Sequence, residues 1–185
     1  MKAPDQSPTT RRIAIISLTV VCALLVLAIF AALRLPTFHP YAVSQSSMEP
    51  TLYQGDKILV NQDYYSHHAF ADGDLLVFRH GDALLIKRIS ALAGETIEGK
   101  DGRVIRNGVQ LNEPYAVYSK DNPLDIETFS SRRIPEGEIF VIGDSRDHSL
   151  DSRSAEYGPV RTSDVVGRVA YVYWSSHPHQ AGRTF

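Results

Sequence analysis

The amino-acid sequence predicts a mainly β protein: an antiparallel folded-sheet or barrel-like domain with a small β excursion, preceded by one N-terminal transmembrane helix. Three observations support this fold class. A charge-free apolar run lies near the start of the 185-residue chain, short apolar runs separated by turn residues follow it, and no later window keeps a helical period of 3.6 residues. The length leaves about 150 residues for one compact β domain after the helix.

The apolar run extends from Ile13 to Leu33 and contains 21 residues without a charge. As an α-helix it would be about 31 Å long, close to the ~30 Å hydrocarbon core of a bilayer. A cleaved secretory signal is the alternative, but its apolar core is usually about 7 to 15 residues long and ends in a small-x-small site. Residues 31–36 contain no convincing site of that kind, so we expect residues 13–33 to be an uncleaved transmembrane anchor.

Basic residues on the two sides of this run predict its orientation. Lys2, Arg11 and Arg12 precede it, whereas Arg34 alone follows it closely. Because basic flanking segments stay in the cytoplasm, residues 1–12 are expected there, with the later domain on the outer, periplasmic or extracellular, side. The sequence therefore predicts a single-pass protein of the cytoplasmic (inner) membrane.

The charge and cysteine content of the outer domain exclude several classes of partner. After Pro36 the chain carries 15 basic and 20 acidic residues and has no basic run, so nucleic acid is not expected as a partner. The single cysteine, Cys22, lies inside the apolar run, which leaves the outer domain without a disulfide or a thiolate metal site. The histidine pairs at 67–68 and 177–179 lie in polar stretches without carboxylates at ligand spacing. No metal and no other cofactor is expected.

The β domain is expected over residues 36–174. It begins with an extended linker at 36–40, because Pro36 and Pro40 cannot continue a helix. Runs rich in Val, Ile, Leu and aromatic residues predict strands at Lys57–Val60, Asp74–Phe78, Leu84–Ile89, Arg103–Ile105, Glu138–Ile142 and Val165–Trp174.

A small β excursion from the main sheet is expected at about 98–138. Asn107-Gly108 stands between two short apolar runs and is the strongest hairpin signal in the chain. Residues 112–133 are polar and are expected to be irregular. The last segment, 175–185, is expected to be a flexible tail.

The first of three polar clusters is a hydroxyl-rich turn over residues 44–52. Pro50 keeps Glu49 out of the α region and so fixes a turn directly ahead of Leu52. A serine on a rigid turn can serve as a nucleophile, although serine-rich turns are also common surface features.

Lys87 lies in the second cluster, residues 84–89. In a strand its side chain shares one face with Leu85 and Ile89, so burial of that face would bury the lysine. Burial lowers a lysine pKa, and a change from ~10.4 to ~8 costs about 3 kcal/mol, which a packed domain can supply. A neutral lysine is a competent general base for a serine hydroxyl. The alternative is a Lys-Arg pair on a solvent-exposed sheet edge that discourages strand addition.

The third cluster, residues 143–153, follows an apolar strand and alternates carboxylates, guanidiniums and hydroxyls. Arginine and aspartate can satisfy each other in planar bidentate pairs. The pattern therefore predicts an internal hydrogen-bonded scaffold rather than a solvated loop.

Taken in order, these clusters resemble the motif boxes of type I signal peptidases, a family with a Ser/Lys dyad. The match covers about residues 44–174. The segments that carry it are Ser47-Met48-Glu49-Pro50-Thr51-Leu52, Gly73-Asp74-Leu75-Leu76-Val77-Phe78, Lys87-Arg88-Ile89 with Gly94-Glu95-Thr96-Ile97, Asn112-Glu113-Pro114-Tyr115, and Gly143-Asp144-Ser145-Arg146-Asp147 through Asp151-Ser152-Arg153.

The resemblance implies a membrane-bound serine endopeptidase that removes signal peptides from exported preproteins after a small-x-small site. It makes Ser47 the nucleophile, which forms an acyl-enzyme, and Lys87 the general base. Ser149 would orient the lysine amine. Four further residues would brace the site: Asp144, Arg146, Asp151 and Arg153.

The oxyanion donors are a point where this sequence departs from the family pattern. The backbone N–H of Ser47 can donate to the oxyanion. In relatives the second donor is a serine hydroxyl two residues earlier, or that position is glycine, whereas this chain has Gln45. The side-chain amide of Gln45 could donate, but it differs in length.

Three other functions remain open from the sequence. A Ser/His/Asp hydrolase could draw on the seven histidines, but the chain has no G-x-S-x-G elbow and no α/β alternation. A conjugation-type or self-processing Ser/Lys peptidase is closer in chemistry. A non-catalytic, membrane-tethered β domain that binds a partner would leave Lys87 ordinary and exposed. The sequence predicts no oligomeric state.

Overall fold

The computed structural model describes residues 8–32, 37–118, 128–155 and 157–185. The chain divides into two compact units, Met1–Pro36 and Thr37–Phe185, which we describe separately. The predicted cytoplasmic segment 1–12 and the predicted end of the anchor at Leu33 lie partly outside the described residues.

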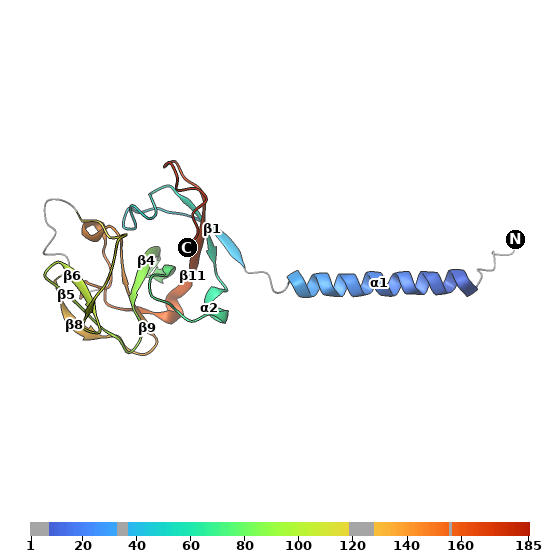
Figure 1. Cartoon of the computed structure of the whole chain (residues 1–185), viewed down its shortest axis with the longest axis horizontal. Helices are drawn as coiled ribbons and strands as arrows, with labels where there is room; N and C mark the ends of the chain where they lie inside the picture. Colours follow the sequence, from blue (N-terminus) through green and yellow to red (C-terminus); the bar gives the residue numbers. More distant parts are fainter. Residues whose placement is uncertain (1–7, 33–36, 119–127, 156) are drawn as a thin grey trace. The chain divides into compact units, whose positions relative to one another are not determined.

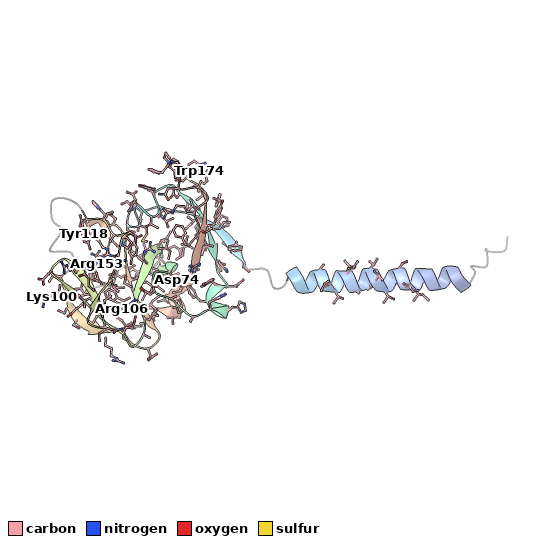
Figure 2. The ribbon with its side chains drawn as sticks, in the orientation of Figure 1. Asp74, Lys100, Arg106, Tyr118, Arg153 and Trp174 are labelled. Carbon is pink, nitrogen blue, oxygen red and sulfur yellow. The ribbon has the colours of Figure 1, made fainter. Side chains whose placement is uncertain are left out.

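The first unit contains the helix α1, Pro8–Ala32 (Figure 1). Ala and Leu are strong helix formers, and after Pro8 the helix contains no glycine or proline that would break it. All large apolar side chains described between residues 15 and 29 are more than half exposed (Figure 2). Within the described residues, we find no helix that reaches the combined length and hydropathy required to cross a membrane.

The second unit is built on a seven-stranded antiparallel sheet with the order β1-β2-β11-β3-β4-β9-β10 (Figure 1). Its strands are β1 Phe38–Ala42, β2 Lys57–Asn61, β3 Leu75–His80, β4 Ala83–Ala91, β9 Glu138–Ile142, β10 Val160–Arg161 and β11 Val165–Trp174. The expected strands at 57–60, 74–78, 84–89, 138–142 and 165–174 are therefore confirmed, with ends that shift by at most two residues.

A second antiparallel sheet of four strands has the order β7-β6-β5-β8. Its strands are β5 Thr96–Lys100, β6 Arg103–Arg106, β7 Val109–Gln110 and β8 Phe129–Arg133. The hairpin at Asn107-Gly108 is confirmed, and both residues have positive φ values of 51° and 78°, as a two-residue hairpin turn requires. The irregular segment expected at 112–133 ends in β8, which the polar sequence of that strand does not reveal. Residues 119–127 lie outside the described part.

Short helical turns complete the second unit. They are α2 at Tyr64–His67 and two 3₁₀ turns at Arg146–His148 and Thr162–Asp164. Three buried apolar clusters form the core, and the third of them joins the two sheets. The first includes Met48 and Leu52, and the third joins Phe140 and Ile142 of β9 to Ile97 of β5. The second sheet is thus packed onto the main sheet through its own core.

The linker predicted at 36–40 is partly wrong, because Phe38–Pro40 belongs to β1, which pairs with β2. Proline is tolerated in a strand at the edge of a sheet, where its missing N–H leaves no ladder partner unsatisfied.

The flexible tail expected at 175–185 also disagrees with the structure. The backbone of this segment returns along β11, with hydrogen bonds that include Val172 N to Arg183 O and Phe185 N to Ala170 O. The Phe185 side chain packs against the first apolar cluster. Polar composition hid this docking, because its contacts depend on a distant part of the chain.

Candidate active site

Ser47 lies on a tight turn whose apolar residues fasten it to the core. Glu49 N donates to Ser46 O and Leu52 N donates to Met48 O, each at 2.9 Å. Met48 and Leu52 are 1% and 0% exposed and belong to the first apolar cluster, so they hold the turn against the core. Ser47 itself is 6% exposed and lines two neighbouring pockets.

Lys87 lies on β4, between β3 and β9, and its side chain is 1% exposed. Its Nζ donates to Ser47 Oγ at 2.6 Å. Burial lowers the pKa of Lys87 from 10.5 to about 8, a fall that Asp151 partly opposes and Arg153 reinforces. The prediction of a lysine buried in an apolar wall is confirmed, and the alternative of an exposed edge pair is wrong.

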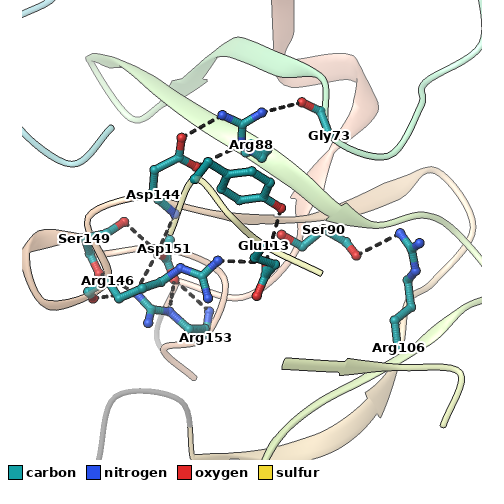
Figure 3. A network of polar contacts seen from close by, with 12 residues as sticks. Gly73, Arg88, Ser90, Arg106, Glu113, Asp144, Arg146, Ser149, Asp151 and Arg153 are labelled. Atoms are coloured by element: carbon teal, nitrogen blue, oxygen red, sulfur yellow. Dashed lines mark hydrogen bonds and ion pairs between the residues drawn. The ribbon is translucent and has the colours of Figure 1, made fainter. Parts of the chain in front are cut away.

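Asp151 is the centre of a buried polar network beside this pair (Figure 3). Its two carboxylate oxygens accept hydrogen bonds from Arg153 Nε at 2.8 Å and from Arg153 Nη2 at 3.0 Å, which form a bidentate pair. They also accept the backbone N–H of Gly143 at 2.9 Å and the hydroxyl of Ser149 at 2.5 Å. One carboxylate therefore fixes the end of β9 and the loop that follows it.

Ser149 was expected to orient the lysine amine through a hydrogen bond. Its hydroxyl instead donates to Asp151, and within the described residues the hydrogen bond of Lys87 Nζ goes to Ser47. Since a hydroxyl that donates its proton still has lone pairs, Ser149 keeps the capacity to accept from an ammonium group.

Gly143 allows Ser149 and Ser47 to approach each other closely. A Cβ atom at this position would lie 2.2 Å from Ser149 Oγ and 2.6 Å from the backbone oxygen of Ser47. Both distances are far below van der Waals contact, so the backbone here requires glycine. Gly143 is the first residue of the third polar cluster, but the sequence alone assigned it no role.

Asp144 pairs with Arg88, the residue after Lys87 on β4. Arg88 donates through Nε at 2.9 Å and through Nη2 at 2.6 Å to the two oxygens of Asp144, and through Nη1 to Gly73 O at 2.9 Å. The guanidinium lies 3.9 Å from the ring centroid of Tyr115. Alternation along the strand puts Arg88 on the face opposite to Lys87, where it fixes the loop at 144.

Arg146 is 1% exposed and donates through Nη2 to Glu113 Oε1 at 2.7 Å. This pair joins the loop after β9 to the segment between β7 and β8 of the second sheet. The expected internal scaffold of Asp144, Arg146, Asp151 and Arg153 is therefore present, and it includes two partners that the sequence did not assign, Arg88 and Glu113.

Two groups near Ser47 could act as oxyanion donors. The backbone N–H of Ser47 makes no hydrogen bond within the described residues. Gln45 is exposed and lines the same two pockets as Ser47, and its side-chain amide likewise makes no hydrogen bond there.

A small pocket of about 40 Å³ opens beside Ser47 on its apolar side. It is lined by Ala42, Val43, Ser44, Gln45, Ser47, Met48, Val77, Leu84 and Ile86. A wider groove of about 520 Å³ is lined by Ser47 and Lys87 and continues to His80, His148, Leu150 and Tyr157. The reactive pair therefore lies between a small apolar pocket and an open, mixed groove. The described residues contain no cluster of ligands that could hold a metal ion.

Comparison with known proteins identifies the family of this chain. The sequence profile described as "Signal peptidase, peptidase S26" matches residues 14–174. Signal peptidase I V of Bacillus subtilis (strain 168) is 35% identical over 144 residues, which cover 72% of this chain and 84% of that protein. Signal peptidase I of Bacillus caldolyticus is 35% identical over 156 residues, which cover 79% of this chain and 85% of that protein.

A crystal structure of a signal peptidase I from Enterococcus faecalis V583 is 30% identical, covers 55% of this chain and 97% of that chain, and has a TM-score of 0.44. The family match spans both the turn with Ser47 and the strand with Lys87. The chain belongs to the signal peptidase family, peptidase S26.

Proposed function

We propose that this protein is a signal peptidase I, a serine endopeptidase that removes signal peptides from preproteins with Ser47 as nucleophile and Lys87 as general base. The observation that carries the assignment of the two residues is the 2.6 Å contact between Lys87 Nζ and Ser47 Oγ, with the lysine almost fully buried. A pKa near 8 leaves a substantial neutral fraction of the amine at physiological pH.

The reaction proceeds in two halves. The neutral amine of Lys87 takes the hydroxyl proton of Ser47 while Oγ attacks the carbonyl carbon of the scissile bond. The lysinium then protonates the leaving amine as the C–N bond breaks, which leaves the signal peptide as an ester on Ser47. A water molecule that loses its proton to Lys87 hydrolyses this ester, and the proton returns to Ser47 Oγ.

The oxyanion of each tetrahedral intermediate is assigned to the backbone N–H of Ser47 and the side-chain amide of Gln45. Both groups lie at the pocket that opens beside Ser47, and neither is engaged with another described residue. Preorganised donors of this kind contribute about 3 to 4 kcal/mol each in acyl transfer. Ser149 is assigned to orient the lysinium through a lone pair of its hydroxyl.

The small apolar pocket fits the preference for a small-x-small site. Its lining includes Ile86 and Val77, and its volume of about 40 Å³ suits a side chain the size of alanine. The partners are therefore preproteins that present small residues just before the cleaved bond.

Residues 13–33 are proposed to anchor the chain in the cytoplasmic membrane, with the β domain on the outer side. The proposal rests on the 21-residue charge-free run and on the basic residues before it. An anchor of this kind would keep the enzyme at the surface where a signal peptide held in the bilayer exposes its cleavage site.

Cleavage of a preprotein with an Ala-x-Ala site by the full chain in phospholipid vesicles tests these assignments. Ser47→Ala and Lys87→Ala are expected to abolish cleavage, whereas the controls Ser66→Ala and Lys100→Ala, at positions away from Ser47, are expected to cleave like the wild type. Activity of Lys87→Ala would overturn the dyad. A wild-type chain that cleaves no preprotein would favour a binding domain instead.

A further inference from the structure

Residues 175–185 follow β11 and lie outside the family match, which ends at residue 174. They do not extend into solvent. Gly182 N donates to Val172 O at 2.8 Å, and Val172 N donates to Arg183 O at 2.9 Å, so the segment runs back beside β11. This return brings its side chains to the turn that carries Ser47.

Two side chains of the segment bind backbone oxygens of that turn. Gln180 Nε2 donates to Pro50 O at 3.1 Å, and Arg183 Nη1 donates to Thr51 O at 3.2 Å. Arg183 Nη1 also donates to Gln180 Oε1 at 2.7 Å, so each side chain holds the other in place. The two carbonyl groups, which follow Ser47 closely, thus receive donors from a segment about 130 residues later in the chain.

A second set of contacts fixes the next part of the same loop. The rings of Tyr53 and His177 stack with centroids 3.8 Å apart and planes inclined by 12°. The buried carboxylate of Asp56 accepts the backbone N–H of Tyr53 at 2.9 Å and the hydroxyl of Ser175. Phe185 packs against the apolar cluster that contains Met48 and Leu52.

From these contacts we propose that residues 175–185 position the nucleophile, with Gln180 and Arg183 as positioning residues that hold the turn of Ser47 against Lys87. The inference rests on the proposed function, because it requires Ser47 to be the reacting group. The turn has only a few backbone hydrogen bonds of its own, and catalytic groups displaced by about 1 Å can lose up to 100-fold in rate.

Gln180→Glu gives a sharp test, because it keeps the shape of the side chain and the acceptor for Arg183. It replaces the N–H that faces Pro50 O by an oxygen, so an attraction becomes a repulsion. We expect kcat to fall about 3- to 10-fold with KM within about twofold, and the rate of acylation of Ser47 to fall by the same factor. Arg183→Ala should act in the same direction, and Arg183→Lys should restore part of the rate.

The pH dependence of the rate distinguishes a displaced Ser47 from a changed pKa of Lys87. Neither variant touches Lys87 or the groups that determine its pKa, so the midpoint of the pH–rate profile should stay near 8 while the plateau falls. Gln110→Glu on the exposed strand β7 adds the same charge at another place and should leave kcat unchanged. Ile139→Val, in another core cluster, controls for a general loss of stability.

Wild-type kcat in both Gln180→Glu and Arg183→Ala would overturn the proposal, and so would an equal loss of kcat in Ile139→Val at the same melting temperature. Ser47→Ala distinguishes a failure of the proposed function from a failure of the positioning role. If Ser47→Ala still cleaves, the proposed function fails, whereas an inactive Ser47→Ala with a fully active Gln180→Glu refutes the positioning role alone.

Discussion

Lys87 Nζ and Ser47 Oγ lie 2.6 Å apart although they come from a central strand and from a turn forty residues earlier. The lysine is almost fully buried, and both Lys87 and Ser47 line the groove beside them. The contact and the burial together give the amine both a proton donor and a lowered pKa. Four predictions follow the consequences of this arrangement.

The first concerns the pH dependence of cleavage. Because only the neutral amine accepts the serine proton, kcat/KM should rise with pH through a midpoint near 8 and level off above it. A series of initial rates between pH 6 and 10 on a preprotein substrate measures this. A midpoint above 10 would mean that the lysine is solvated during the reaction.

The second concerns the stability of the chain when the lysine is removed. A pKa lowered from 10.5 to about 8 corresponds to about 3 kcal/mol of unfavourable burial, which is fully present below pH 8. Lys87→Met should therefore be inactive yet more stable at pH 7, by up to about 3 kcal/mol. Wild-type stability should rise between pH 8 and 10.5, where the unfolded chain binds the extra proton, and the variant should lack this rise.

Denaturant unfolding in detergent micelles, followed by fluorescence, checks this prediction. Lys100→Met on the exposed end of β5 is the matched control and should change the free energy of unfolding by less than about 0.5 kcal/mol. A destabilised Lys87→Met would mean that its attraction to Asp151 outweighs its desolvation.

The third concerns Asp151. Asp151→Asn removes the buried carboxylate that accepts from Arg153 Nε and Nη2 and should cost about 3 kcal/mol or more of stability. It should also lower the pKa of Lys87 further, since Asp151 raises that pKa and Arg153 lowers it, so the midpoint of the rate profile should move below 8. Asp164→Asn, which removes an exposed ion pair with Arg161, should change stability by less than about 1 kcal/mol. An upward shift of the midpoint would contradict the electrostatic account.

The fourth concerns Gly143. Gly143→Ala places a methyl group 2.2 Å from Ser149 Oγ and 2.6 Å from Ser47 O, so both residues must move. We expect kcat to fall at least tenfold. Removing the serine side chain as well, in Gly143→Ala with Ser149→Gly, should not restore it, because the clash with the Ser47 backbone remains. Gly81→Asn, at a left-handed turn with open space around it, should retain full activity and serves as the control.

Much of the fold was predictable because it depends on local patterns. Val165–Trp174 and Glu138–Ile142 read as strands from their apolar content, and Asn107-Gly108 read as a hairpin from the positive φ values that it favours. The strand β8 and the docked segment 175–185 were missed, since their polar residues are held by partners far away in the chain. The contacts of Glu113 with Arg146 and of Tyr115 with Arg88 were hidden for the same reason.

By itself, the sequence determined the chemistry that is available: a serine on a fixed turn, a lysine at an apolar position of a strand, and alternating charges after a buried strand. Strand alternation put Lys87 on the same face as Leu85 and Ile89 but left open whether that face is buried, and so whether the pKa of the lysine is lowered. Only the tertiary structure decided which groups meet, because the 2.6 Å contact of Lys87 with Ser47 and the hydrogen bonds of residues 180 and 183 to Pro50 and Thr51 join distant segments. Such contacts depend on how two sheets and their loops pack, and no local pattern encodes that packing.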